Sequence, residues 1–280
     1  MKEATLDSRP ASVGPISLLQ PITAPAAALA LLCAMLWGGT SVAIQYAQDD
    51  WPPLLTAAAR FAMGSAFIAL WCLWDRQPLA LRAEQFRPVM IAGTLLALQI
   101  GLFHWGHRFT SAAHGQVLVG SNPVWVALLA HFLLPGDRLT LWKSIGLGIA
   151  AAGVLAVVIG SSGGSAHATQ AGSLFGDVIV FVSSWFLATK VVYTNYALAT
   201  VEPGKLVLWS NLFGTLLLLV AGLSTESAAN LTITATSLWA LLYQGVVVAG
   251  FCFAAWTYLL RRHRASQLAE ALSPVSRGFN

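Results

Sequence analysis

The stretch AAALALLCAMLWGGTSVAIQYA, residues 26–47, contains no charged side chain over its 22 positions. A helix needs about 20 apolar residues to cross the hydrocarbon core of a bilayer, because only internal hydrogen bonds can satisfy its backbone there. This stretch therefore predicts a membrane-spanning helix.

Seven more apolar runs of similar length follow along the chain. They lie near residues 54–74, 88–107, 113–134, 141–160, 174–196, 205–223 and 237–258, and a ninth begins near Ala265. Of the 280 residues, 57% are hydrophobic and 9% are charged, whereas a water-soluble domain has about 25% charged residues. We therefore expect an all-α integral membrane protein whose first partner is the lipid bilayer.

The charges between the runs predict the orientation. With the N-terminus in the cytoplasm, one side receives eleven Lys and Arg residues and the other receives only Arg108. Cytoplasmic loops are enriched in these residues, which indicates a multi-pass protein of the cell inner (plasma) membrane. Segments 48–53, 108–112, 161–172 and 224–236 then form the predicted outer end, and the remaining connections the predicted inner end. The eleven are Lys2, Arg9, Arg76, Arg82, Arg87, Arg138, Lys143, Lys205, Arg261, Arg262 and Arg264.

The segment before the first run differs from a secretory signal. Residues 1–25 carry Lys2, Glu3, Asp7 and Arg9 among prolines, without the continuous apolar core and cleavage site of a signal peptide. We expect a disordered cytoplasmic tail. The net charge of +4 comes without an aromatic-basic groove pattern, so no nucleic-acid partner is predicted.

Landmark residues recur between the two halves of the chain. Trp37 corresponds to Trp185 at an offset of 148 residues. At an offset of 151 residues, Trp105 corresponds to Trp256 and Pro123 to Pro274. The proline turn at 52–53 similarly corresponds to the turn at 202–204. Chance recurrence in a Trp-rich chain is the alternative. Two related halves of five spans each would lie in opposite orientations, as in many secondary transporters with a substrate site between the halves.

Several motifs resemble the EamA family of the drug/metabolite transporter superfamily over residues 26–276. They are Trp37-Gly38, the proline turn followed by Arg60-Phe61, and NPVWVALLAHFLLPGDRL at 122–139. The resemblance implies ten helices in two inverted five-helix repeats that move small metabolites, amino acids or drugs. Residues 26–160 then form the first repeat and residues 174–280 the second. Asp137-Arg138 stands where the family usually has Glu-Arg.

The two repeats differ in length. Repeat one continues about 37 residues beyond Pro123, to Gly160, whereas six residues follow Pro274. We expect the second repeat to be incomplete, lacking most of span nine and all of span ten.

Polar residues inside the apolar runs are the candidate substrate path, because ionisable groups at membrane depth usually face a partner or a wet cavity. Snorkelling of Arg60 and Lys190 to an interface is an open alternative, as is interhelical hydrogen bonding for the uncharged residues. The deep tryptophans either line the path or pack. The candidates are Arg60, Gln99, His104, Asn122, Lys190, Asn211 and Gln244, with Trp37, Trp185 and Trp256. Gly146, Gly148 and Gly153 are expected to form a small-residue face for close helix contact.

No catalytic motif or phosphate-binding loop occurs in the sequence, so neither an enzyme nor a cofactor is predicted. His104, His107 and His114 are close in sequence, but they lack a nearby carboxylate in the third or fourth run, and no metal site is predicted. The favoured function is a secondary active exporter working by alternating access, with a coupling proton and a homodimer left open. The alternatives are a lipid-modifying membrane enzyme and a non-transporting fragment that needs a partner.

Overall fold

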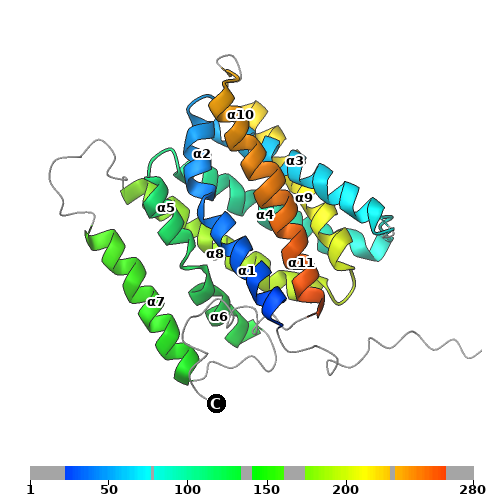
Figure 1. Ribbon diagram of the computed structural model, residues 1–280, viewed down its shortest axis with the longest axis horizontal. Coiled ribbons are helices and arrows are strands. Elements are labelled where there is room, and N and C mark those ends of the chain that lie inside the picture. The colour runs from blue at the N-terminus through cyan, green and yellow to red at the C-terminus, as the bar shows by residue number, and fades with distance from the viewer. Residues whose placement is uncertain (1–22, 77–78, 134–140, 161–173, 228–230, 263–280) are drawn as a thin grey trace, which may run out of the picture.

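The computed structural model describes residues 23–76, 79–133, 141–160, 174–227 and 231–262. Most of the predicted tail and the run from Ala265 lie outside these residues. Within them the secondary structure is helical, as predicted (Figure 1). The helices of the first half are α1 (Ala24–Gly38), α2 (Thr40–Gln48), α3 (Pro53–Trp74), α4 (Ala83–Gly106), α5 (Ala112–Val119), α6 (Asn122–Leu133) and α7 (Leu141–Gly160). Those of the second half are α8 (Leu174–Ala197), α9 (Pro203–Thr225), α10 (Ala235–Leu242), the π-helix η2 (Tyr243–Cys252) and α11 (Phe253–Arg262).

The apolar runs coincide with these helices. Among the described residues, seven helical segments are long and apolar enough to cross a membrane, and three of them combine consecutive helices: Ala24–Gln48, Ala112–Leu133 and Ala235–Trp256. The predicted span at 141–160 is α7, which contains the shorter apolar stretch Ser144–Ala156. The all-α membrane architecture is thereby confirmed.

Connections predicted to share one side of the membrane lie together. At the predicted outer end, the Thr232 hydroxyl donates to Asp50 Oδ1 at 2.9 Å, and Gln45 Nε2 donates to the Thr110 carbonyl at 2.9 Å. At the predicted inner end, Gln85 Nε2 donates to the Thr200 carbonyl at 2.9 Å. The helices therefore alternate in direction as the positive-inside pattern requires.

The two halves of the chain are interleaved in the bundle. Helix α3 packs against α9 and η2, while α4 packs against α8 and α9. Helices α1 and α2 of the first half lie along α10, η2 and α11 of the second half. Helix α7 contacts α5 and α6 at one edge of the bundle, as Figure 1 shows. Most helices of the first half thus contact the second half directly.

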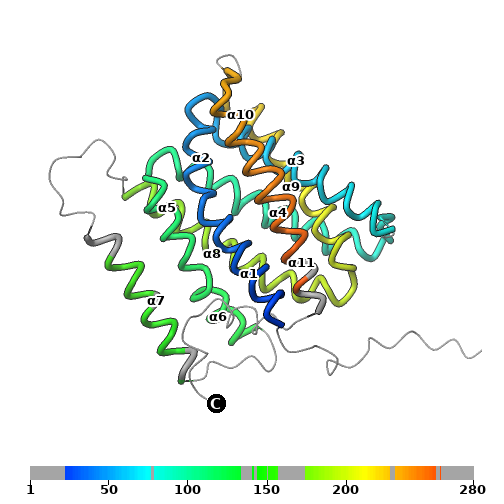
Figure 2. Tube along the Cα trace, viewed as in Figure 1, coloured from blue at the N-terminus to red at the C-terminus, as the bar shows by residue number. Residues whose placement is uncertain are grey.

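The first span is broken at Gly38-Gly39, between α1 and α2 (Figure 2). The hydroxyl of Tyr243, from η2, donates to the Leu36 carbonyl at 2.5 Å. A Cβ atom on Gly39 would lie 2.6 Å from this hydroxyl. Glycine at position 39 therefore allows a side chain of the second half to bond the backbone at the break.

A second break separates α5 from α6, immediately before Pro123. Proline has no N–H to donate to the carbonyl four residues earlier, which is that of Val119. The Ser184 hydroxyl from α8 lies 3.5 Å from this carbonyl. The same Ser184 hydroxyl lies 3.1 Å from the Ser121 hydroxyl. The carbonyl that proline leaves free thus contacts a neighbouring helix.

Close helix contacts use other glycines than the sequence suggested. A Cβ atom on Gly146, Gly148 or Gly153 would meet nothing within 4 Å among the described residues, so the expected small-residue contact face on α7 is wrong. Instead, Gly64 of α3 lies against Ala249 of η2. Small residues occurred on both helices, but the sequence did not reveal which face meets a neighbour.

Candidate functional site

Arg60 is the central residue of the candidate site. It lies seven residues after Pro53, the first residue of α3, which is about 10 Å along a helix at 1.5 Å per residue. Its side chain is 4% exposed, and its Nε and Nη1 atoms have no hydrogen-bond partner among the described residues. The side chains of Tyr243 and Cys252 on η2 lie near it. The position therefore does not fit a snorkelling arginine.

His104 of α4 lies beside Arg60, and Gln244 of η2 lies beside His104. The Nδ1 atom of His104 is 3.0 Å from the Ile100 carbonyl, which can only accept, so Nδ1 carries a proton. In the neutral ring Nε2 is then an acceptor, and it has no partner among the described residues. The Gln244 amide nitrogen donates to the Ala43 carbonyl at 3.0 Å, while its Oε1 is likewise unpartnered.

Lys190 of α8 is close enough to Arg60 for their charges to interact. Its Nζ atom lies 5.5 Å from the ring centre of Phe253. The Phe253 ring packs edge-to-face on Phe61 at 6.2 Å and on Trp37 at 6.3 Å. His107 also interacts electrostatically with Arg60. We call these neighbouring side chains the Arg60 cluster, which consists of Arg60, Lys190, His104, His107 and Gln244.

Two further candidates are buried elsewhere in the same bundle. Asn211 of α9 is 1% exposed, and neither of its amide atoms has a partner among the described residues. Gln99 of α4 is buried as well, one helical turn before Phe103. Asn122 is half-buried at the start of α6, with its Oδ1 unpartnered within the described chain.

The tryptophans separate into two environments. Trp37 and Trp256 pack edge-to-face with ring centres 5.3 Å apart, next to the Phe61–Phe253 pair. Trp185 is 42% exposed and packs edge-to-face on Phe186 of its own helix. No contact of the described residues joins Trp185 to the Arg60 cluster.

A buried carboxylate was missed in the sequence. Asp177 lies within the sixth apolar run, near the start of α8, and is 7% exposed. It accepts a hydrogen bond from the Thr110 hydroxyl and lies 3.2 Å from Nδ1 of His114. An acidic residue inside an apolar run is the signal that could have identified it, although its partners become visible only when α5 packs on α8.

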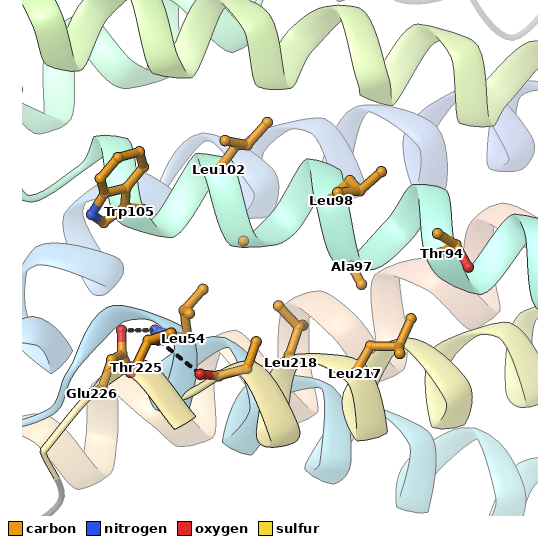
Figure 3. Close-up of a pocket in the computed structure, with 12 residues that line it drawn as sticks. Leu54, Thr94, Ala97, Leu98, Leu102, Trp105, Leu217, Leu218, Thr225 and Glu226 are labelled. Atoms are coloured by element: carbon orange, nitrogen blue, oxygen red, sulfur yellow. Dashed lines mark hydrogen bonds between the residues drawn. The ribbon is translucent and has the colours of Figure 1, made fainter. Parts of the chain in front are cut away.

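One groove among the described residues is lined mainly by apolar side chains. It occupies about 560 Å³ between α4 and α9, and Leu98, Leu102, Trp105 and Leu217 lie along it (Figure 3). Leu98 and Trp105 are 45% and 42% exposed. Trp105 therefore lies at the outer surface of the bundle, where such a lining suits an acyl chain better than a polar solute.

Glu226 marks one end of this groove. Its carboxylate accepts the backbone N–H of Leu54 at 2.8 Å (Figure 3). It also accepts the backbone N–H of Leu55 at 3.1 Å. Helix α3 begins after Pro52, whose side chain cannot cap it. A residue that follows α9 thus caps the helix that carries Arg60.

Known proteins with similar sequences are transporters by name. Residues 24–159 match the model of the EamA-like transporter family. An uncharacterized transporter of Bacillus subtilis (strain 168), YoaV, is 27% identical over 241 residues, covering 85% of this chain and 80% of the relative. A probable amino-acid metabolite efflux pump of Salmonella typhimurium is 26% identical over 261 residues, covering 88% of this chain and 82% of its own.

A solved crystal structure has the same fold. It aligns with a TM-score of 0.67 and 18% identity, covering 89% of this chain and 85% of the other. The family match, the named relatives and the apolar helices agree with one another. This chain is a multi-pass membrane transporter with an EamA-like transporter domain over residues 24–159, consistent with the EamA family of drug/metabolite transporters.

Proposed function

We propose that this chain is a secondary active transporter that exports small organic metabolites by alternating access between two inverted repeats. The observation that supports this most is a set of buried side-chain atoms without partners in the middle of the bundle. Among the described residues they include atoms of Arg60, His104, Asn211 and Gln244, which come from α3, α4, α9 and η2.

Unpartnered polar atoms are costly in a membrane protein. A buried amide without a hydrogen bond costs roughly 1–3 kcal/mol by mutational measures, and lipid offers no compensating donor or acceptor. Such atoms persist where water or a solute supplies the missing bonds. Their position on helices from both halves suits a solute site between two repeats.

The packing supports the division into repeats at 26–160 and 174–280. Pro53 begins α3 and Pro203 begins α9, an offset of 150. Gly64 of α3 lies against η2, and Gly214, at the same offset, lies against α4. Under this division the contact of α3 with η2 joins the second span of one repeat to the third span of the other, and so does the contact of α9 with α4. The contact of α4 with α8 likewise corresponds to the contacts of α1 and α2 with the eighth span.

Irregular backbone near the cluster supports a moving element. The break between α1 and α2 and the π-helix η2 are joined by the bonds from Tyr243 and Gln244 to backbone carbonyls. Discontinuous helices at midplane and π-helical segments are common at functional sites. We infer that these segments change conformation when access alternates.

Orientation and direction are part of the proposal. The positive-inside pattern favours an inner-membrane protein with a cytoplasmic N-terminus, and the efflux pumps named among its relatives favour export. A coupling proton and a homodimer fit this scheme as further proposals.

Counterflow in proteoliposomes tests the function. Proteoliposomes that contain the purified protein are preloaded with one unlabelled solute from a panel of amino acids, nucleosides and drugs. For at least one solute of the panel, they should accumulate the labelled form from outside. Asn211→Leu should reduce that rate about tenfold, the effect of losing one hydrogen bond to solute worth about 1.4 kcal/mol. Because the Asn211 amide has no hydrogen-bond partner in the part of the chain that the structure describes, this variant should keep its stability.

Thr94→Val is the matched control. The Thr94 hydroxyl is exposed and donates to the Met90 carbonyl of its own helix at 2.9 Å, so its removal should leave transport unchanged. Failure of the intact protein to move any solute of the panel, or equal loss in both variants, would refute the proposal.

A further inference from the structure

We propose that the coupling proton binds to His114, and that the resulting imidazolium pairs with Asp177 to hold the predicted outer end of the bundle closed. This inference rests on the proposed function and names the group that would couple it to a proton. The geometry that carries it is a contact between the two halves of the chain. Nδ1 of His114, on α5, lies 3.2 Å from Oδ2 of Asp177, on α8, and only 12% and 9% of the two side chains are exposed.

Asp177 belongs to the second half of the chain, whereas its partners belong to the first half. The Thr110 hydroxyl donates to Oδ1 of Asp177, and the Thr110 carbonyl accepts from Gln45 Nε2 on α2 at 2.9 Å. The start of α5 is fixed beside them, because the Ser111 hydroxyl accepts the backbone N–H of His114 at 3.2 Å. Asp177 thus ties the start of α8 to the start of α5 and, through Thr110, to α2.

The backbone around this tie is closely packed. A Cβ atom on Gly176, the neighbour of Asp177, would lie 2.6 Å from the carbonyl carbon of Phe109. A Cβ atom on Gly106 would lie 2.7 Å from the Val180 side chain one turn further along α8. A solute between the halves can leave at this end only after the halves separate, and separation here breaks the contacts of Asp177.

The hydrogen bond assigns the protons of the pair. A carboxylate only accepts, so Nδ1 of His114 carries a proton in this contact, and Nε2 of the neutral ring is an acceptor. Uptake of a proton at Nε2 makes the ring a cation and leaves the bond from Nδ1 to Asp177 in place. A charge-assisted hydrogen bond is roughly twice as strong as a neutral one. Because histidines commonly change charge between about pH 5 and pH 8, one proton from the outer solution would strengthen the tie.

The other titratable and charged groups on the packed helices are engaged elsewhere or lie further away. His107, which follows α4, has Nδ1 2.7 Å from the Phe103 carbonyl, and its ring packs against α5 at Gly115. Asp50, which follows α2, accepts from the hydroxyls of Thr232 and Thr234. The remaining groups on these helices are Tyr46, Asp49 and Arg108 near the outer end, His104 and Lys190 deeper in the bundle, and Glu84, Arg87, His131, Lys143, Tyr193 and Tyr196 toward the inner end.

Other hydrogen bonds between the halves have donors that do not titrate. At the outer end the Thr232 hydroxyl donates to Asp50, and at the inner end the Gln85 amide donates to the Thr200 carbonyl at 2.9 Å. A proton on His114 therefore acts on the outer tie and not on these bonds. Since a ligand shifts a conformational equilibrium only through contacts that differ between its states, the bound proton would favour closure of the outer end and return of the empty protein to the inner side.

A double-mutant cycle of His114→Gln and Asp177→Asn, read by melting of the purified protein in detergent, tests the tie without transport. The coupling should be larger at about pH 5.5 than at about pH 8.5, because the imidazolium is favoured at low pH and is lost as the pH rises. A charged instead of a neutral donor should raise the coupling constant about fivefold. Thr110→Val is the matched control, since it removes a donor to Asp177 that does not titrate and should destabilise equally at both pH values.

If Asp177→Asn does not fold, the melting difference between wild type and His114→Gln at the two pH values measures the same dependence. Transport then assigns the proton. In proteoliposomes, efflux of a solute that shows counterflow should accelerate when the outer solution is acidified. The ratio of acid-driven efflux to counterflow should fall at least about fivefold in His114→Gln, the low end of typical coupling between two sites. His131→Gln makes the same substitution at an exposed position near the end of α6 and should keep the wild-type ratio.

The outcomes separate this inference from the proposed function. Counterflow by the wild type with efflux that does not respond to the outer pH would refute the inference and leave the transporter standing. Absence of counterflow, together with a coupling that grows at acidic pH, would refute the transporter and support the proton site. A coupling that is equal at both pH values, or a ratio in His114→Gln equal to that in His131→Gln, would overturn the inference.

Discussion

Replacing Gly64 by alanine should loosen the helix pair that holds Arg60 in place. The added Cβ would lie 2.7 Å from Ala249 Cβ and 3.0 Å from the Ala249 backbone carbon. Because backbone cannot turn away as a flexible side chain can, α3 and η2 would have to separate. Overpacking of this kind costs about 1–3 kcal/mol.

The gain in helix propensity from glycine to alanine, up to about 1 kcal/mol, would hide part of this cost. Gly146→Ala is therefore the matched control, since it has the same propensity gain and meets nothing within 4 Å among the described residues. The difference between the two variants isolates the packing cost. At about 2–4 °C per kcal/mol, Gly64→Ala should melt about 2–12 °C below Gly146→Ala.

Tryptophan fluorescence during heating in detergent measures both midpoints. Gly214→Ala should fall between them, because its nearest contact, at 2.5 Å, is the end of the Leu96 side chain, which can rotate. A Gly64→Ala protein that melts at or above Gly146→Ala would show that the α3–η2 contact is not as tight as described.

Three more predictions concern the ends of the helices. Glu226→Ala should lower stability by about 1–2 kcal/mol, the value of a helix cap with its dipole term, and Glu226→Gln by about half as much in the same melting assay, unless the carboxylate does not cap α3. Hydrogen bonds from Thr234, Ser237 and Thr232 lower the pKa of Asp50, so its stabilisation is present above the unfolded pKa of about 3.9 and is lost as the pH falls through the lower folded value. Asp50→Asn should consequently melt below wild type at pH 7, and the difference should shrink as the pH falls below about 3.9; a difference that stays constant down to low pH would contradict the assignment. Asp177→Asn and His114→Gln should each destabilise, and a double-mutant cycle should give a coupling above about 0.5 kcal/mol, whereas additivity would mean that the pair is not formed.

The positions of the spans could be predicted because composition alone determines them. A run such as 54–74 must be a helix once it is in lipid, and α3 at Pro53–Trp74 agrees within one residue. The break before Pro123 was likewise signalled by the chemistry of proline. Consecutive spans must alternate in direction across a bilayer, and the contact of Gln85 with Thr200 joins two connections that the Lys and Arg pattern assigns to the same end.

The partners of side chains could not be predicted in the same way. Arg60 and Lys190 were found in separate runs, but their proximity depends on how α3, α8 and η2 pack around Phe253. Asp177 was overlooked since its partners Thr110 and His114 lie more than 60 positions away. Period and composition describe one helix at a time, whereas a site between helices depends on their rotation about their own axes.

The irregular segments connect these observations. A regular α-helix through Gly38-Gly39 would use the Leu36 carbonyl internally, yet this carbonyl accepts from Tyr243, and Ala43 further along accepts from Gln244. Both donors begin η2, so the first span and the eighth are held together by side chains that bond backbone. Gln244 also lies beside His104. A Cβ atom added to Gly245 would lie 3.2 Å from the Arg60 carbonyl oxygen. A shift of η2 would therefore move the Gln244 side chain, the contact behind Arg60 and the break in the first span at the same time. Coupling solute binding to a change in access requires such a segment, because a ligand shifts a conformational equilibrium only through contacts that differ between its two states.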